Sequence, residues 1–270
     1  MSSRAGSPSA FSPISCTLIQ GESEAVLVDT PISVSQTESL VSWIKETAVG
    51  KELKYIYITH GHGDHWFGIS VLQKHWPNLR AIATPATVAS MKEQLSREKF
   101  EGIWLKLFPG DQIPQPLVLA TAMDSDTFNI EGHTFRAIEV GHSDTHDTTI
   151  LHVLSIDLVV AGDVVYGDVH QYFGEANTTE KRNEWLRAID LIESLKPQTV
   201  IAGHKRAGTV DGVFNLRATR QYIVDFENAV KSTSNWQDLW ERMKELYPGR
   251  INPHAILAGA VAAFPNEGKQ

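Results

Sequence analysis

The chain has 270 residues, 42% of them hydrophobic, and its 24 basic against 32 acidic side chains give a formal net charge of −8. This length suffices for one large α/β domain, and the acidic balance argues against a nucleic-acid enzyme, which normally shows a basic surface. The single cysteine, Cys16, excludes an internal disulfide, and no apolar run reaches the roughly 18 residues that a membrane span requires. We therefore expect a cytoplasmic protein that binds neither nucleic acid nor membrane.

The first 13 residues differ in composition from the rest of the chain. They are rich in Ser, Gly and Pro and lack the apolar segment of a secretory signal, so residues 1–13 are predicted to form a flexible N-terminus. No Pro/Gly/Ser-rich linker divides the remainder. Residues 14–270 are therefore predicted to form a single domain, with C-terminal helices over about residues 215–264 packed on its core.

The first half of this domain is predicted to alternate strands with helices. Strands are expected at residues 14–20, 25–29 and 55–58, and helices at residues 35–50, 67–75 and 84–100. Ser35 and Glu38 have the spacing of a capping box, and Gly50 is expected to stop that helix. Thr84 followed by Pro85 is typical of an N-cap with proline at the first helical position.

The second half continues the alternation. Strands are expected at residues 127–130, 133–140, 158–161 and 199–202, and helices at residues 184–195 and, two or three of them, within 215–264. Helices on both faces of the strands predict a four-layer αββα sandwich.

A dense group of potential metal ligands follows the strand at residues 55–58. It has the form HxHxDH and contains His60, His62, Asp64 and His65. In an extended segment, residues i, i+2 and i+4 point to the same side, which groups His60, His62 and Asp64 and turns His65 elsewhere. One short loop is thus expected to serve two neighbouring metal ions.

Three further strands are each followed by a glycine and a ligand-type residue: Gly141 and His142, Gly162 and Asp163, Gly203 and His204. Glycine permits a positive φ or a close approach of the backbone to an ion. Packing alone does not explain such a concentration of polar side chains, because buried polar groups need partners. The four strand ends are therefore expected to converge on one metal centre.

These motifs and their order resemble the metallo-β-lactamase superfamily over roughly residues 14–262. The resemblance implies a first metal site at His60, His62 and His142 and a second at Asp64, His65 and His204. Asp163 matches the carboxylate that bridges the two ions in the glyoxalase II and lactonase branches. The true β-lactamases differ at these positions, so antibiotic hydrolysis is not the first expectation.

The implied activity is dinuclear, metal-dependent hydrolysis of an ester-like bond in a small molecule. A metal-bridging hydroxide would attack the acyl carbonyl of a lactone, lactam or thioester. Two Zn²⁺ ions are expected, although histidine and carboxylate ligands also suit iron and manganese. One alternative is a mononuclear iron dioxygenase of the persulfide dioxygenase type, which resembles this chain at His60, His62, His142 and Asp163. A metal-binding protein without catalysis is a third possibility.

Catalytic roles are predicted for three residues. Asp64 is expected to be a ligand that also orients the attacking water. Tyr166 and His170 follow Asp163 at +3 and +7, where they would hydrogen-bond a substrate carbonyl or protonate a leaving group, or else form pocket wall. Asp29, at the end of a strand, is either an acid that supports a ligand or a turn residue.

Aromatic residues raise two further expectations. Trp104 and Phe108 either form an apolar pocket mouth with other aromatic residues or pack at i and i+4 on a helix. An exposed aromatic patch near Trp236 and Trp240 would be compatible with a homodimer.

Overall fold

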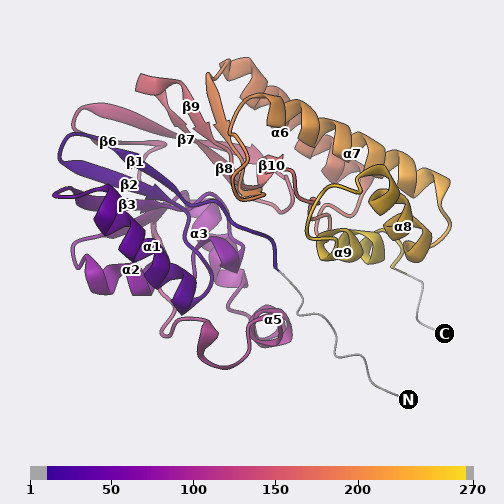
Figure 1. Ribbon diagram of the computed structural model, residues 1–270, viewed down its shortest axis with the longest axis horizontal. Helices are drawn as coiled ribbons and strands as arrows, with labels where there is room; N and C mark the ends of the chain where they lie inside the picture. The colour runs from indigo at the N-terminus through magenta and orange to yellow at the C-terminus, as the bar shows by residue number, and fades with distance from the viewer. Residues whose placement is uncertain (1–10, 266–270) are drawn as a thin grey trace.

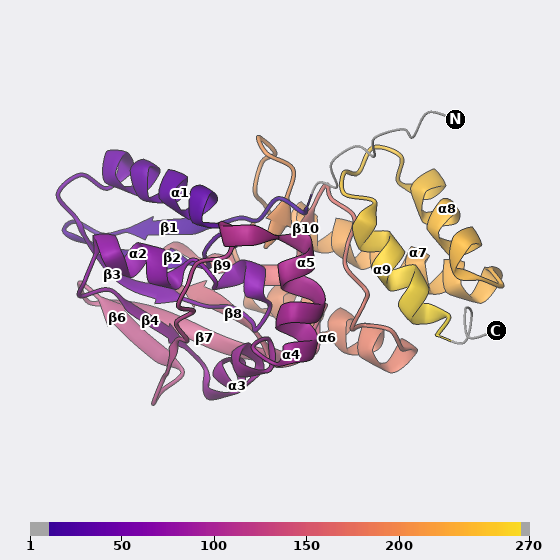
Figure 2. The same cartoon turned by 90° about the horizontal axis from the view of Figure 1, so that it is seen from below.

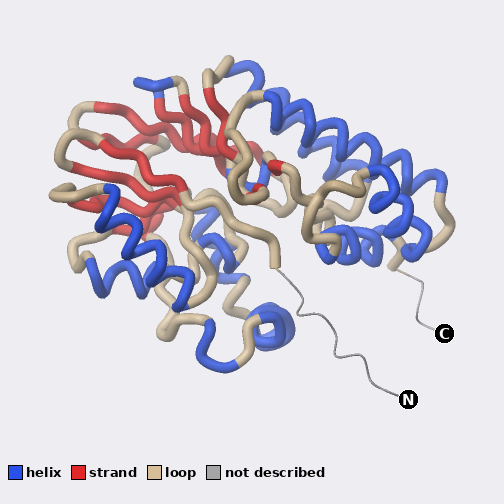
Figure 3. Tube along the Cα trace, viewed as in Figure 1, coloured by secondary structure: helices blue, strands red, loops and turns tan. Residues whose placement is uncertain are grey.

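The computed structural model describes residues 11–265 (Figure 1). Most of the predicted flexible N-terminus, residues 1–10, lies outside the described residues. Two five-stranded sheets form the centre of the molecule, and strands and helices separate clearly in Figure 3. No helix in the described part of the chain is long and apolar enough to cross a membrane.

The first sheet has the order β1-β2-β3-β4-β5. Its strands are β1 Thr17–Gln20, β2 Glu24–Val28, β3 Glu52–Tyr57, β4 Arg80–Ala83 and β5 Thr121–Ala122. β1 and β2 form an antiparallel hairpin, and β2 to β5 are parallel. The parallel strands therefore end at the same edge, where the loop after β3 carries the HxHxDH motif.

The second sheet has the order β11-β9-β8-β7-β6. Its strands are β6 Thr127–Ile130, β7 His133–Gly141, β8 Thr148–Val153, β9 Leu158–Val160 and β11 Thr199–Ile201. β9 and β11 are parallel, whereas the other neighbours are antiparallel. A separate parallel pair is formed by β10 Tyr166–Gly167 and β12 His204–Lys205.

Helices cover the outer face of each sheet (Figures 1 and 2). The first sheet is covered by α1 Val34–Thr47, α2 Ile69–His75 and α3 Pro85–Glu93, and at its end follow α4 Arg97–Lys99, the π-helical turn η2 Phe100–Trp104 and α5 Leu105–Leu107. The second is covered by α6 Thr179–Leu195 and α7 Phe214–Ser232, beside which lie α8 Trp236–Leu246 and α9 His254–Ala263. Short 3₁₀ turns occur at η1 Gly63–His65, η3 Gly110–Gln112, η4 Leu154–Ile156 and η5 Gly162–Val164.

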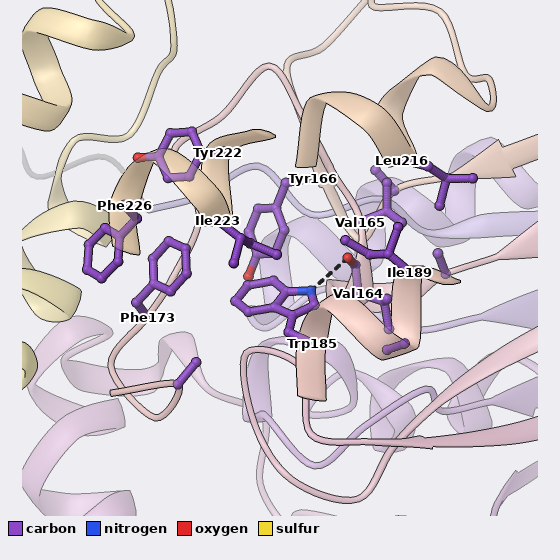
Figure 4. Packing of buried hydrophobic residues seen from close by; sticks show 14 of the residues in the cluster. Val164, Val165, Tyr166, Phe173, Trp185, Ile189, Leu216, Tyr222, Ile223 and Phe226 are labelled. Atoms are coloured by element: carbon purple, nitrogen blue, oxygen red, sulfur yellow. Dashed lines mark hydrogen bonds between the residues drawn. The ribbon is translucent and has the colours of Figure 1, made fainter. Parts of the chain in front are cut away.

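Three apolar layers hold the sandwich together. Alternate residues of β2 show how, because Leu27 packs under the helices of the first sheet while Val26 and Val28 pack between the sheets. The third layer lies between the second sheet and α6 to α9. In Figure 4 the indole of Trp185 on α6 donates to the carbonyl of Val164, 2.9 Å away, which ties this layer to the turn that carries Asp163. The predicted four-layer αββα sandwich is confirmed.

Local signals explain most element boundaries, with two corrections. The N-cap of α1 is Ser33 rather than Ser35: its extended backbone lets its hydroxyl accept from the backbone N–H of Gln36. Thr84 caps α3 as predicted, but α3 ends at Glu93, and Ser96 caps a new helical segment before residue 100. Polar side chains near a helix start compete as caps, and only the backbone turn decides between them.

At the opposite end of the strands, one carboxylate joins the two sheets. Glu131, in the β6–β7 turn, accepts from the backbone N–H groups of Glu22 and Ser23, both at 2.6 Å, and of Glu24 at 3.1 Å. The Ser23 hydroxyl donates to it as well. This contact clamps the β1–β2 turn of the first sheet to the second sheet.

Candidate metal centre

Four segments converge at the carboxyl edge of the sheets. They are the loop after β3, the β7–β8 connection, η5 after β9, and β12 after β11. Their donor atoms form groups in which all ligand atoms lie within 4.8 Å of one another. We call His60, His62 and Asp144 the first half-site, and Asp64, His65 and His204 the second half-site.

The first half-site is compact and buried. Nδ1 of His62 lies 3.0 Å from Oδ2 of Asp144, and the rings of His60 and His62 are 5.1 Å apart in an edge-to-face arrangement. Asp144 is fully buried and His60 is fully buried. The sequence prediction for the metal ligands did not include Asp144.

The second half-site contains two adjacent residues of the HxHxDH loop. Oδ2 of Asp64 lies 3.8 Å from Nε2 of His65 and 3.4 Å from Nε2 of His204. The expectation that His65 points away from its neighbours is wrong, because Gly63–His65 forms a 3₁₀ turn instead of an extended strand. That turn brings the ring of His65 to 4.1 Å from the ring of His60.

Asp163 lies between the half-sites. Its Oδ1 is 3.3 Å from Nε2 of His65, its Oδ2 is 3.2 Å from Nε2 of His204, and it groups with His60 as well. Gly203 permits this approach, since an added Cβ would collide with Oδ1 of Asp163. Asp163 therefore contacts donors of the second half-site while grouping with His60 of the first.

Three buried atoms test whether a cation fits this centre. Nε2 of His60, Oδ2 of Asp144 and Oδ1 of Asp163 have no hydrogen-bond partner among the described residues. A buried polar atom without a partner costs about 1–3 kcal/mol, and more when it is charged. Nitrogen and oxygen donors that face one another without hydrogen bonds are satisfied together by divalent cations, so the residues fit metal ions.

Hydrogen bonds on the outer ring nitrogens orient the histidines of the second half-site. Nδ1 of His65 donates to Oδ2 of Asp29 at 2.9 Å, and Asp29 also accepts from the backbone N–H and hydroxyl of Thr59, both at 2.8 Å. Nδ1 of His204 donates to the carbonyl of Pro13 at 3.0 Å. Of the two interpretations of Asp29, the structure favours the acid that supports a ligand.

The first half-site has outer partners too. Nδ1 of His60 lies 3.0 Å from the hydroxyl of Thr59, and Nε2 of His62 lies 3.5 Å from Oε1 of Glu175. Each ring therefore directs its other nitrogen inward, as metal-ligating histidines do.

The role of His142 as a ligand of the first metal site stays a prediction. Nδ1 of His142 donates to the carbonyl of Ser143 at 2.7 Å, and this residue belongs to none of the donor groups formed by the described residues. Gly141 has a φ of +79°, and the register of β7 against β8 shifts at this point, so the chain leaves the sheet before His142. The loop then brings Asp144, two residues later, to the centre. The acid in the polar loop after Gly141 was the available signal, although spacing does not distinguish it from His142.

The pKa values of the centre show which of its residues carry protons when no cation is bound. Burial and, after it, the neighbouring His65 together lower the pKa of His60 to about 4, so His60 is neutral. Burial also disfavours charge on His204, but Asp163 and Asp64 outweigh it and raise its pKa to about 10. Burial opposes ionisation of Asp163, yet the charges of His204 and His65 hold its pKa well below the usual range. Without metal the inner nitrogens of the second half-site hold protons, which bound cations would displace.

The centre forms the floor of a cavity of about 400 Å³. Its walls come from two distant segments: Ile103, Trp104 and Leu107 near α5, and His254, Ala255 and Ala258 on α9. Tyr166, Tyr172 and Glu175 lie between the walls and the floor. Trp104 thus lines the cavity as well as packing against Phe67.

Two of the three predicted catalytic residues lie at the metal centre, and the third does not. Asp64 lies in the second half-site, and the hydroxyl of Tyr166 donates to Oδ2 of Asp163 at 2.7 Å. His170 does not line this cavity: its ring is buried against the hydroxyl of Tyr222, 2.8 Å from Nδ1, and its backbone N–H donates to Ile251. The loop after β10 runs toward the C-terminal helices, which carries His170 away from the centre.

Trp236 and Trp240, the basis of the expected homodimer, are partly buried against the C-terminal part of the core. The indole of Trp240 donates to the carbonyl of Pro253 at 3.3 Å, and Lys244 lies over its ring. Association of two chains stays a prediction.

Known proteins are similar to this chain in sequence and fold. The family model described as the metallo-beta-lactamase superfamily matches residues 10–204. A metallo-beta-lactamase type 2 of Bacteroides fragilis is 22% identical over 224 residues, covering 82% of this chain and 78% of that protein. An atrochrysone carboxyl ACP thioesterase of Aspergillus fumigatus is 25% identical over 174 residues, covering 63% of this chain but only 32% of the thioesterase.

A solved structure agrees with the observed architecture. A metallo-beta-lactamase from Pontibacter korlensis superposes with a TM-score of 0.56 at 21% identity, covering 77% of this chain and 86% of that one. Because the family model spans most of the chain and both half-sites lie in its motifs or in the loops beside them, the chain belongs to the metallo-β-lactamase superfamily and is a metal-dependent hydrolase.

Proposed function

We propose that the protein hydrolyses an ester-like acyl bond of a small molecule at a dinuclear metal centre. The observation that carries this proposal is Asp163, whose two carboxylate oxygens face different histidines at 3.3 and 3.2 Å while it also groups with His60 of the first half-site. A single buried carboxylate shared in this way is the arrangement that two-metal hydrolytic sites use.

The chemistry assigned to bound ions is limited and general. When bound, divalent cations polarise an acyl carbonyl and lower the pKa of a water nucleophile toward neutrality. The residues of the chain would hold the ions, orient the substrate and shield the centre. Asp64, with a pKa that His65 and His204 bring down to about 2 against the opposing effect of burial, stays ionised as a donor at neutral pH.

Two tyrosines that line the cavity keep their hydroxyl groups protonated at neutral pH. Burial, reinforced by Asp163, holds the pKa of Tyr166 well above its ordinary value, so its hydroxyl remains a donor to Asp163. Burial raises the pKa of Tyr172 to about 12, and its ring meets His62 edge to face at 5.8 Å. We assign to Tyr172 a hydrogen bond to the substrate carbonyl or leaving group.

The cavity suits a small acyl compound. Its volume of about 400 Å³ lies within the range of small-molecule sites, and its apolar walls would accept a hydrocarbon or ring portion of the substrate. The similarity to an ACP thioesterase makes a thioester the first class to test, and lactones and lactams follow.

Metal content and turnover together test the proposal. Protein purified without added metal is measured by plasma mass spectrometry and assayed against matched thioesters, lactones and lactams. We expect about two divalent ions per chain and turnover of one acyl class, with zinc as the first candidate. Bound metal without turnover of any acyl substrate would contradict the proposal. So would one iron ion per chain with oxygen uptake on a persulfide, which is the dioxygenase alternative.

A further inference from the structure

We infer that residues 11–15 form part of the substrate site, and that Phe11 selects substrates whose acyl group carries a hydrocarbon chain or ring. The inference rests on the proposed function and names the substrate class for it. Phe11 and Ser12 line the cavity above the metal centre together with the walls from α5 and α9. In Figure 1 the described N-terminal end of the chain, in indigo, lies between these two helices. The segment therefore contributes a third wall.

The backbone of this segment is fixed to the metal centre. The carbonyl of Pro13 accepts from Nδ1 of His204 at 3.0 Å, and Ile14 forms an antiparallel bridge with the same histidine. The backbone N–H of Ser15 donates to the carbonyl of Gly203 at 2.7 Å. These contacts hold the segment in a set position relative to the second half-site, so the side chains that precede it are directed to the cavity.

A side-chain contact attaches the segment to the C-terminal wall as well. Nδ2 of Asn252, just before α9, donates to the hydroxyl of Ser12. Asn252 has a φ of +61°, and its Oδ1 is buried without a hydrogen-bond partner among the described residues. Unfavourable features of this kind persist where the surrounding structure fixes a residue. The contact with Ser12 is therefore a built connection between the segment and the wall from α9.

Phe11 is held by aromatic contacts and is still partly exposed. Its ring meets the ring of Phe108 nearly edge-on at 5.2 Å and lies 6.3 Å from the ring of Trp104. The side chain is 38% exposed, and Ile103 and Leu107, which line the same cavity, are 48% and 50% exposed. Large apolar side chains gathered at one opening mark a contact surface for an apolar group.

The occupant that fits this surface is the part of the substrate away from the scissile bond. The apolar side chains and the metal donors line one cavity, so a molecule with its acyl carbonyl at the metal centre extends its remaining atoms along the walls. The wall from α9 presents the small side chains of Ala255 and Ala258, which leave room for them.

The charges of the cavity favour an uncharged group in this position. Lys99 is the only lysine or arginine among the described residues that line the cavity. Its ammonium lies 3.6 Å from Oε1 of Glu175 and 3.8 Å from Oε2 of Glu93, so two carboxylates already balance its charge. A hydrocarbon chain or an aromatic ring therefore suits the walls better than a charged group does.

Metal-binding probes that differ only in their hydrocarbon tail test the inference. Acetohydroxamate and octanohydroxamate carry the same chelating group, so the ratio of their dissociation constants reports the tail. Both are titrated by calorimetry into zinc-loaded protein whose metal content is measured by plasma mass spectrometry. The variant is Phe11→Ala, and the matched control is Phe214→Ala, since Phe214 is 51% exposed and is not among the residues that line the cavity.

For the parent protein we expect octanohydroxamate to bind about tenfold more tightly than acetohydroxamate, because its tail leaves water for an apolar wall. Phe11→Ala should lower this ratio by about threefold with unchanged metal content, and Phe214→Ala should keep the parental ratio. Equal affinities of the two probes for the parent, or no binding of octanohydroxamate, would overturn the apolar subsite. An unchanged ratio in Phe11→Ala would overturn the role of Phe11, whereas fewer than two ions in the loaded parent would overturn the proposed function.

Two further variants separate a lost contact from a disturbed fold. Phe11→Leu keeps an apolar side chain and should restore most of the parental ratio. Ala258→Phe fills the space beside α9 and should weaken octanohydroxamate binding while acetohydroxamate binding stays close to the parental value. Circular dichroism checks that each variant is folded. A ratio in Phe11→Leu as low as in Phe11→Ala, or equal losses for both probes in Ala258→Phe, would contradict an apolar subsite between these walls.

Discussion

The two half-sites are assembled by different means. In the second half-site, Asp64 and His65 are adjacent in the chain, and His204 lies at the start of β12, paired directly with β10. In the first half-site, the third donor comes from a loop whose shape depends on its own hydrogen bonds. The sheet fixes the position of a donor at a strand end, whereas hydrogen bonds within the loop fix the position of a donor in a loop. Strand periodicity therefore places His204 correctly but misplaces His65, whose position depends on the 3₁₀ turn Gly63–His65.

The largest effect is expected from the residue that both half-sites share. Asp163→Ala should lower bound metal from about two ions toward one or none per chain. It should lower turnover by about three orders of magnitude, because metal ions supply several kcal/mol of transition-state stabilisation. Plasma mass spectrometry and steady-state kinetics check both. Unchanged metal content and activity would remove the dinuclear interpretation.

A smaller effect, confined to one half-site, is expected from Asp29→Asn. Asp29 touches no inner donor atom but fixes the ring of His65 through Nδ1, so we expect metal affinity to fall by about 10–100-fold. Glu175→Gln is the matched change for the first half-site. Because Glu175 lies 3.5 Å from His62 and is partly exposed, its effect should be weaker. Chelator competition measures both, and a larger loss in Glu175→Gln would reverse the comparison.

Tyr166→Phe should affect turnover without removing metal. It deletes the hydrogen bond to Oδ2 of Asp163, and bonds to charged groups contribute about 1.5–3 kcal/mol. We expect kcat to fall by about tenfold or somewhat more, with two ions still bound. Loss of an ion in this variant would show that the hydroxyl is needed to hold Asp163 in its shared position.

The smallest effect on the centre is expected from Glu131→Gln, at the far end of the sandwich. Hydrogen bonds from Ser23 and its backbone lower the pKa of Glu131 from 4.5 to about 2. A lowered folded-state pKa stabilises the fold above pH 4.5, and this contribution is lost as the pH falls toward 2. Thermal unfolding should therefore separate the variant from the parent at pH 7, and the difference should shrink in acid. Metal content should not change, and a change would indicate coupling between the two ends.

Much of the architecture is readable from the sequence because it follows from local rules. The turn at Glu131 and Gly132, the cap at Thr84 and the alternation of strands and helices all express preferences of a few neighbouring residues. Where two local signals competed, as at Ser33 and Ser35, the sequence alone did not decide, since both can cap a helix.

The metal centre likewise has features that follow from the sequence and features that depend on the tertiary structure. By itself the sequence determined the presence of a histidine- and aspartate-rich centre after β3, β9 and β11, because residues that follow parallel strands directly are carried to one edge of the sheets. Only the tertiary structure decided that His65 turns inward, that His170 turns away, and that Asp144 lies beside His60 and His62. Each of these depends on backbone turns, at Gly63–His65, after β10 and at Gly141. A change of direction within two residues reassigns side chains that a regular spacing treats as equivalent.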